Sequence, residues 1–106
     1  MRTLANYTIF EGKVWLLHVF ETENGNIVHY PFEKELEATR YIEGIAIVCR
    51  ANGKNDDIIK STPPMPGEKW KQYAERMAGL LSEHGTRPPY SVYAVEFPLL
   101  RPVKLK

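Results

Sequence analysis

Two short turn signals constrain this chain more than any other feature, because each joins two segments of strong strand character. The runs 3–10 and 13–21 are rich in β-branched and aromatic residues, and only Glu11-Gly12 separates them. Asn24-Gly25, the strongest hairpin signal in the chain, follows the second run and precedes a third run, 26–32. The spacing predicts three consecutive antiparallel strands.

The two turns also predict which residues face each other across the hairpins. Counting outward from Glu11-Gly12 places Ile9 opposite Val14 and Tyr7 opposite Leu16, and counting from Asn24-Gly25 places Phe20 opposite His29 and Val19 opposite Tyr30. Strict alternation then assigns two faces. One carries Tyr7, Ile9, Val14, Leu16, His18, Phe20, Ile27 and His29, and the other carries Thr8, Phe10, Lys13, Trp15, Leu17, Val19, Val28 and Tyr30.

The middle of the chain is less regular. Residues 33–43 mix helix-favouring and strand-favouring types, so we expect a helical turn or loop that leads into a strand. The apolar run 45–50 predicts a central strand covered on both faces. After the turn signal Asn52-Gly53, residues 57–60 are expected to form a short return strand, and the proline-rich stretch 61–67 a loop.

One amphipathic helix is predicted over residues 66–84. Apolar side chains recur there at helical spacing, Pro66 suits the first turn, and His84 and Gly85 suit the end. Residues 90–97 alternate in polarity and predict a last strand that returns to the sheet. The 106 residues therefore predict a single α+β domain, with an antiparallel sheet of about five strands and one helix packed on one face.

Composition limits the partners of such a domain. The net charge of +1 provides no field for nucleic acid, and the only basic cluster is the tail with Arg101, Lys104 and Lys106, which argues against a nucleic-acid partner. Cys49 is the only cysteine, and residues 1–20 lack the apolar run of a signal peptide or membrane span. We expect a cytoplasmic protein without a membrane partner. Because the glycines are isolated, no nucleotide cofactor is expected.

Both predicted sheet faces are apolar, although a single helix can cover only one of them. The second face is expected to be covered by the segment around Leu36 and the tail with Leu99, Leu100 and Val103, or by a second copy of the chain. We favour a homodimer formed through the sheet.

The predicted register makes His18 and His29 diagonal neighbours on one face, at a spacing that suits two ligands of one metal ion. A third ligand would have to come from Cys49, Glu21, Glu96 or His84. Two half-buried histidines with locally satisfied ring nitrogens are the simpler interpretation. Cys49 could act as a nucleophile with one histidine as its base, but its apolar neighbours favour a buried structural cysteine.

Aromatic side chains give the remaining candidate site. Trp15, Tyr30, Phe32 and Tyr93 could form a binding surface, although core packing is the first interpretation for most aromatic residues. The leading hypothesis is a non-enzymatic binding or assembly module that associates with itself or with an unknown protein or small molecule. The alternative is a small metal-binding or thiol-dependent enzyme that uses His18, His29 and Cys49.

Overall fold

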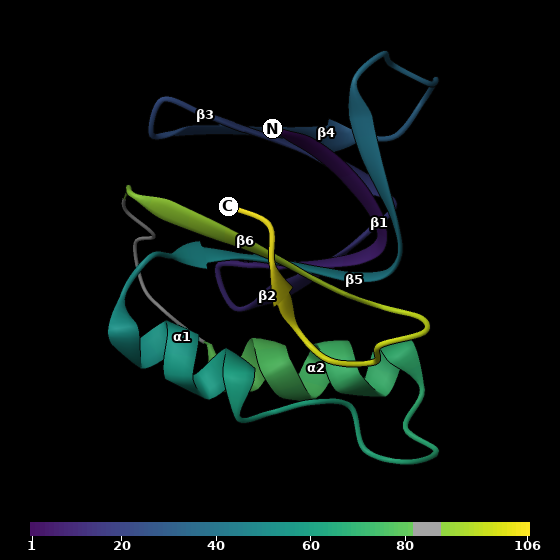
Figure 1. The fold of residues 1–106 in the computed structure, drawn as a ribbon. Helices are drawn as coiled ribbons and strands as arrows, with labels where there is room; N and C mark the ends of the chain where they lie inside the picture. The colour runs from purple at the N-terminus through teal and green to yellow at the C-terminus, as the bar shows by residue number, and fades with distance from the viewer. Residues whose placement is uncertain (82–87) are drawn as a thin grey trace.

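The computed structural model describes residues 1–81 and 88–106, which form one mixed seven-stranded sheet and two helices (Figure 1). The elements in chain order are β1 (Arg2–Phe10), β2 (Lys13–Leu16), β3 (His18–Glu23), β4 (Asn26–Pro31), β5 (Thr39–Arg50), α1 (Gly53–Lys60), α2 (Trp70–Leu80), β6 (Tyr90–Glu96) and β7 (Val103–Lys104). The sheet order is β4-β3-β1-β5-β6-β7, and β2 pairs with β1. The α+β class is therefore confirmed.

The two predicted hairpins form in the predicted register. Ile9 pairs with Val14 and Tyr7 with Leu16 around the first turn. Phe20 pairs with His29 and Val19 with Tyr30 around the second. Glu11, Gly12, Asn24 and Gly25 all have positive φ angles, as tight hairpin turns with the right-handed strand twist require.

The sheet differs from the predicted five antiparallel strands in two respects. First, β1 and β5 pair in parallel, because the chain passes through β2, β3 and β4 before β5 arrives beside β1. Second, there are more strands, because Leu17 divides the predicted second strand into β2 and β3 and the tail adds β7 against β6. The ambiguous stretch is a connection over 32–38, after which β5 begins at Thr39.

A line of irregular residues bends the sheet across its middle. Leu17 interrupts β2 and β3 with a φ of 45°, and its N–H donates to the carbonyl of Asn6 in β1 over 3.2 Å. The side-chain oxygen of Asn6 accepts from the N–H of Gly44 in β5 over 3.0 Å, and Gly44 has a φ of 152°. The register between β1 and β5 also shifts between Ala5 and Tyr7. Such irregularities bend strands and increase their twist, and here they lie on three adjacent strand runs.

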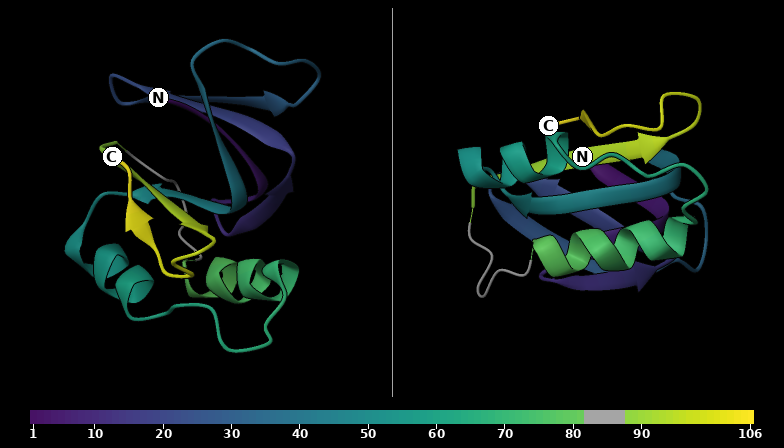
Figure 2. Two further views of the ribbon diagram at one scale, coloured as in Figure 1. Left: turned by 45° about the vertical axis from the view of Figure 1, so that its right-hand side comes forward. Right: turned by 90° about the horizontal axis from the view of Figure 1, so that it is seen from below.

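The bend curls the sheet around a concave inner face (Figures 1 and 2). The outer face of the lower half packs on α1 and α2, in a cluster of buried side chains that includes Ile45, Ile47, Ile59, Tyr73 and Met77. The inner face buries Phe10, Phe20, Val48 and Val92, and Leu105 of the tail packs against them. For the second face, either the segment around Leu36 and the tail or a second copy was expected as the cover. The curl of the sheet and Leu105 of the tail cover the inner face within the chain.

The two assigned faces are wrong because of this bend. Strict alternation predicts Trp15 and His18 on opposite faces, but their rings lie 5.0 Å apart on the inner face. The extra residue at Leu17 reverses the alternation, so that the side chains after it take the opposite parity from those before it.

The helices also differ from the prediction. Residues 57–60 belong to α1 rather than to a strand, because Asn52 caps that helix: its side-chain oxygen accepts from the N–H of Asn55 over 2.8 Å. The helix α2 begins at Trp70 rather than at Pro66, because the Glu68 carboxylate accepts from Met65 N–H and from Arg76 and so holds the preceding residues in a turn. The predicted end of the helix at His84 lies outside the described residues. None of the helices described is long and apolar enough to cross a membrane.

Candidate functional site

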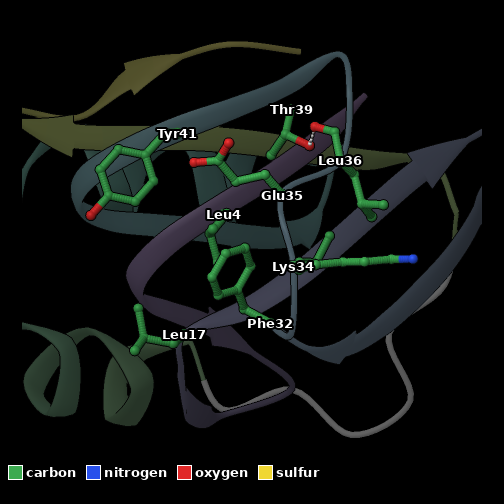
Figure 3. Close-up of a pocket in the computed structure, with 9 residues that line it drawn as sticks. Leu4, Leu17, Phe32, Lys34, Glu35, Leu36, Thr39 and Tyr41 are labelled. Atoms are coloured by element: carbon green, nitrogen blue, oxygen red, sulfur yellow. Dashed lines mark hydrogen bonds between the residues drawn. The ribbon is translucent and has the colours of Figure 1, made fainter.

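A hollow beside the bend lies on the outer face of the upper half of the sheet, where neither helix reaches. This hollow, the outer groove, has a volume of about 490 Å³ and lies beneath the connection 32–38 (Figure 3). Its lining residues are Leu4, Leu17, Val19, Phe32, Lys34, Glu35, Leu36, Thr39 and Tyr41. Small-molecule and peptide sites are typically hollows of this size with mainly apolar walls.

The floor and the rim of the outer groove differ in exposure. Leu4 and Val19 form a buried floor, with 7% and 2% of their surface exposed. At the rim, Leu17 and Tyr41 are each 50% exposed and Phe32 is 38% exposed. Figure 3 shows the Phe32 ring over the floor, with the Tyr41 ring and the Glu35 carboxylate near each other at one side. Several large apolar side chains are therefore accessible around one hollow, which is the usual mark of a binding surface.

Hydrogen bonds hold the connection that roofs the groove. Thr39 Oγ1 donates to the carbonyl of Leu36 over 2.8 Å, and the Arg2 guanidinium donates to the carbonyl of Glu37. Arg2 also forms an ion pair with Glu21 at 3.3 Å. The hydrogen bond donated by the Tyr30 hydroxyl, together with Arg2, lowers the pKa of the Glu21 carboxyl and keeps it charged beside Arg2 at neutral pH.

The apolar surface continues from the outer groove towards the start of α2. A second hollow of about 430 Å³ shares Leu17 with the outer groove and is also lined by Leu16 and Trp70. A third, of about 720 Å³, shares Trp70 with the second and is lined by Met65, Phe97 and other residues. Leu16 is 65% and Phe97 67% exposed. The three hollows thus form one mainly apolar strip along the bend, the apolar strip, in which Asn6 and Glu43 of the second hollow are the polar exceptions beside Leu17.

The predicted histidine pair lies on the inner face, within an aromatic cluster. The His18 and His29 rings are 5.4 Å apart, Trp15 lies 4.7 Å from His29, and Phe20 stacks on His29 at 4.9 Å. The His29 Nδ1 atom is buried and has no hydrogen-bond partner among the described residues. The two rings are close enough to share a ligand, as their register predicted.

Three of the four candidate third ligands do not join them. Cys49 packs in the cluster under the helices, on the other face of the sheet, and Glu21 is engaged by Arg2 and Tyr30. Glu96 forms an ion pair with Arg40, and His84 lies outside the described residues. Within residues 1–81 and 88–106, no group of three metal-ligating side chains is found. Cys49 is likewise separated from both histidines by the sheet, so neither is placed to activate its thiol.

The four aromatic residues predicted to form a binding surface are not brought together. Phe32 lines the outer groove, and Tyr30 donates to Glu21 beside it. Trp15 belongs to the inner aromatic cluster, where its Nε1 donates to the carbonyl of Phe10 over 3.2 Å. Tyr93 is only 1% exposed and its hydroxyl donates to Asp56. Burial raises the pKa of Tyr93, with the Asp56 hydrogen bond as a second cause.

Sequence reasoning did not identify Leu4, Leu17 and Tyr41 as groove residues. The sequence carried no signal for Leu17, because residues 14–17 are all large and apolar and no single pair among them marks a break in the alternation. Tyr41 lay in the segment of mixed propensity, where no face could be assigned.

Comparison with known proteins gives no further assignment. No family model, curated protein or solved structure matches this chain. The site therefore has to be interpreted from its own geometry.

Proposed function

We propose that this chain is a non-enzymatic binding module, and that its binding surface is the outer groove with the apolar strip that continues from it. The observation that supports the proposal is the exposure of Leu17, Phe32 and Tyr41 around one hollow of about 490 Å³. An apolar group that enters the groove would remove these side chains from water, which stabilises a complex by about 25 cal/mol for each Å² buried.

The form of the surface favours a polypeptide segment over a compact small molecule. Leu17 lines both the first and the second hollow, and Trp70 lines both the second and the third. The three hollows are therefore connected, and an extended apolar segment could contact all of them. Lys34 and Glu35 lie at the groove with opposite charges, and polar residues around an apolar centre are typical of protein interfaces.

A solvatochromic dye tests whether the groove binds apolar groups. Nile red is neutral, and its fluorescence rises when it leaves water, so titration with the folded protein should give a saturable signal. Leu17→Asn should weaken this binding by roughly tenfold, because one leucine contact contributes on the order of 1.5 kcal/mol. Asparagine also tolerates the positive φ at this position, so the fold should be retained.

Leu80→Asn is the matched control. Leu80 is also 50% exposed, but it lies at the end of α2 and does not line the groove. Its replacement should leave dye binding unchanged. The absence of saturable binding to the wild type, or an equal loss in both variants, would contradict the proposal.

The metal-binding alternative has one observation in its favour, the 5.4 Å separation of His18 and His29. Native mass spectrometry with added Zn²⁺ tests it. One bound ion that is lost in His18→Ala would promote this alternative over the binding module.

A further inference from the structure

The free edge of β4 presents unpaired backbone groups. β4 is the end strand of the sheet, and no other strand among the described residues pairs with this edge. Phe32 N–H donates to the Leu17 carbonyl over 2.9 Å, and Thr22 N–H donates to the Met1 carbonyl over 2.8 Å. These two hydrogen bonds show which backbone groups of β3 and β4 point towards each other and which point away. Since these directions alternate along a strand, Val28 and Tyr30 hydrogen-bond to β3, whereas the N–H and C=O groups of Ile27 and His29 point outward.

This edge lacks the features that usually protect an end strand. Natural sheets protect their edges with charged residues, bulges, very short strands or proline. β4 has six residues, none of them charged, and its one proline is the terminal Pro31. Val28, in its middle, is 58% exposed. The opposite edge, β7, is only two residues long and carries Lys104.

We propose that a second copy of this chain pairs with β4 in antiparallel orientation, about a two-fold axis at Val28. Ile27 then faces the partner's His29, and His29 the partner's Ile27. Each outward N–H meets an outward C=O, so these two pairs form four backbone hydrogen bonds. A second copy is the favoured partner because the two-fold axis places the outward N–H groups of one β4 opposite the outward C=O groups of the other.

The side chains at the axis fit the same arrangement. Val28 faces the partner's Val28 as a pair without backbone hydrogen bonds, in which the Cα atoms approach to about 4.5 Å. Two exposed valines are thereby removed from water. This dimer uses the strand edge rather than the outer groove, so it goes beyond the proposed binding function.

A charged side chain introduced at the two-fold axis tests the arrangement. Sedimentation velocity across a wide concentration range should show a dimer for the wild type. Val28→Lys and Val28→Glu should each weaken dimerisation by at least roughly tenfold, because like charges then face each other and the apolar contact is lost. An equimolar mixture of the two variants should restore the dimer, because opposite charges meet at the axis.

Val103→Lys and Val103→Glu on β7 are the controls, since Val103 is 39% exposed on the other edge, and they should leave the dimer unchanged. Hydrogen exchange tests the wild type without substitution: the Ile27 and His29 amides should be protected. A monomeric wild type, fast exchange of both amides, or a dimer that persists in both single variants would overturn the proposal. Nile red binding should be the same in the folded Val28 variants, which separates this outcome from a failure of the groove.

Discussion

Gly44 is the position at which the bend can be tested most directly, with alanine as the substitution. A Cβ atom at this position would lie 2.3 Å from the carbonyl oxygen of Val95 and 3.3 Å from Cζ2 of Trp70. The Val95 carbonyl belongs to β6, which pairs with β5 at this point, so it cannot move without disturbing the ladder. The φ of 152° adds strain for any residue with a side chain.

These two effects set the expected size of the destabilisation. A residue held in an unfavourable backbone region costs about 1–3 kcal/mol, and overpacking of a tight site costs a similar amount. We therefore expect Gly44→Ala to lower the free energy of unfolding by about 3 kcal/mol or more, a large part of the 5–15 kcal/mol that is typical of a domain. For a chain of this length the midpoint of thermal unfolding should fall by roughly 10–20 °C.

Circular dichroism during thermal and urea unfolding measures this change. Gly79→Ala is the matched control, because a Cβ atom there meets no other atom within 4 Å and the residue is exposed in α2. It should stabilise the protein by about 0.5–1 kcal/mol, since alanine favours the helix. A free energy of unfolding for Gly44→Ala within about 0.5 kcal/mol of the wild-type value would show that the close approach of β5 and β6 does not require glycine. It would contradict the role of Gly44 in the bend.

Three further predictions concern titration and reactivity. The hydrogen bond from Tyr93 lowers the pKa of Asp56 in the folded protein, and Lys60 is the second cause. The charged Asp56 carboxylate therefore stabilises the fold at pH values above its pKa in the unfolded chain. This stabilisation is lost as the pH falls through the pKa of Asp56 in the folded protein. The wild type should therefore be more stable than Asp56→Asn at neutral pH, and this difference in the free energy of unfolding should become smaller below about pH 4. Circular dichroism during unfolding at several pH values measures it. Burial raises the pKa of Tyr73 to about 12, so stability should decline as the pH rises from about 10 to 12, and less so in Tyr73→Phe. Cys49, with 5% of its surface exposed in the helix-facing core, should react with iodoacetamide at neutral pH only as fast as the protein opens, which mass spectrometry can follow.

The parts of the fold that depend on neighbouring residues were predictable from the sequence. The registers of both hairpins follow from two-residue turns, so Ile9 opposite Val14 and Phe20 opposite His29 could be derived by counting. The last strand and most of α2 also follow from local periodicity. The proximity of His18 and His29 was obtained in the same way.

The remaining features depend on contacts between distant residues. The parallel pairing of β1 with β5 is a choice of neighbour that no local pattern specifies. The hydrogen bond between Asn6 and Gly44 joins residues 38 positions apart, and the burial of Leu105 on the inner face depends on how far the sheet curls. Exposure of Leu17 could not be derived, since its αL conformation reverses the alternation on which the face assignment depended.

The bend also explains why the outer groove, the proposed binding surface, lies where it does. α2 has 11 residues and is therefore about 16 Å long, while the molecule extends over 34 Å, so the helix cannot cover the whole outer face. The irregular residues Asn6, Leu17 and Gly44 turn the upper half of the sheet away from α2, which leaves the floor at Leu4 and Val19 to be covered by the connection 32–38. That connection covers it incompletely, because a short irregular segment buries less apolar surface than a helix. The same residues that close the inner core thus leave an apolar groove outside, and the proposed binding function depends on both features.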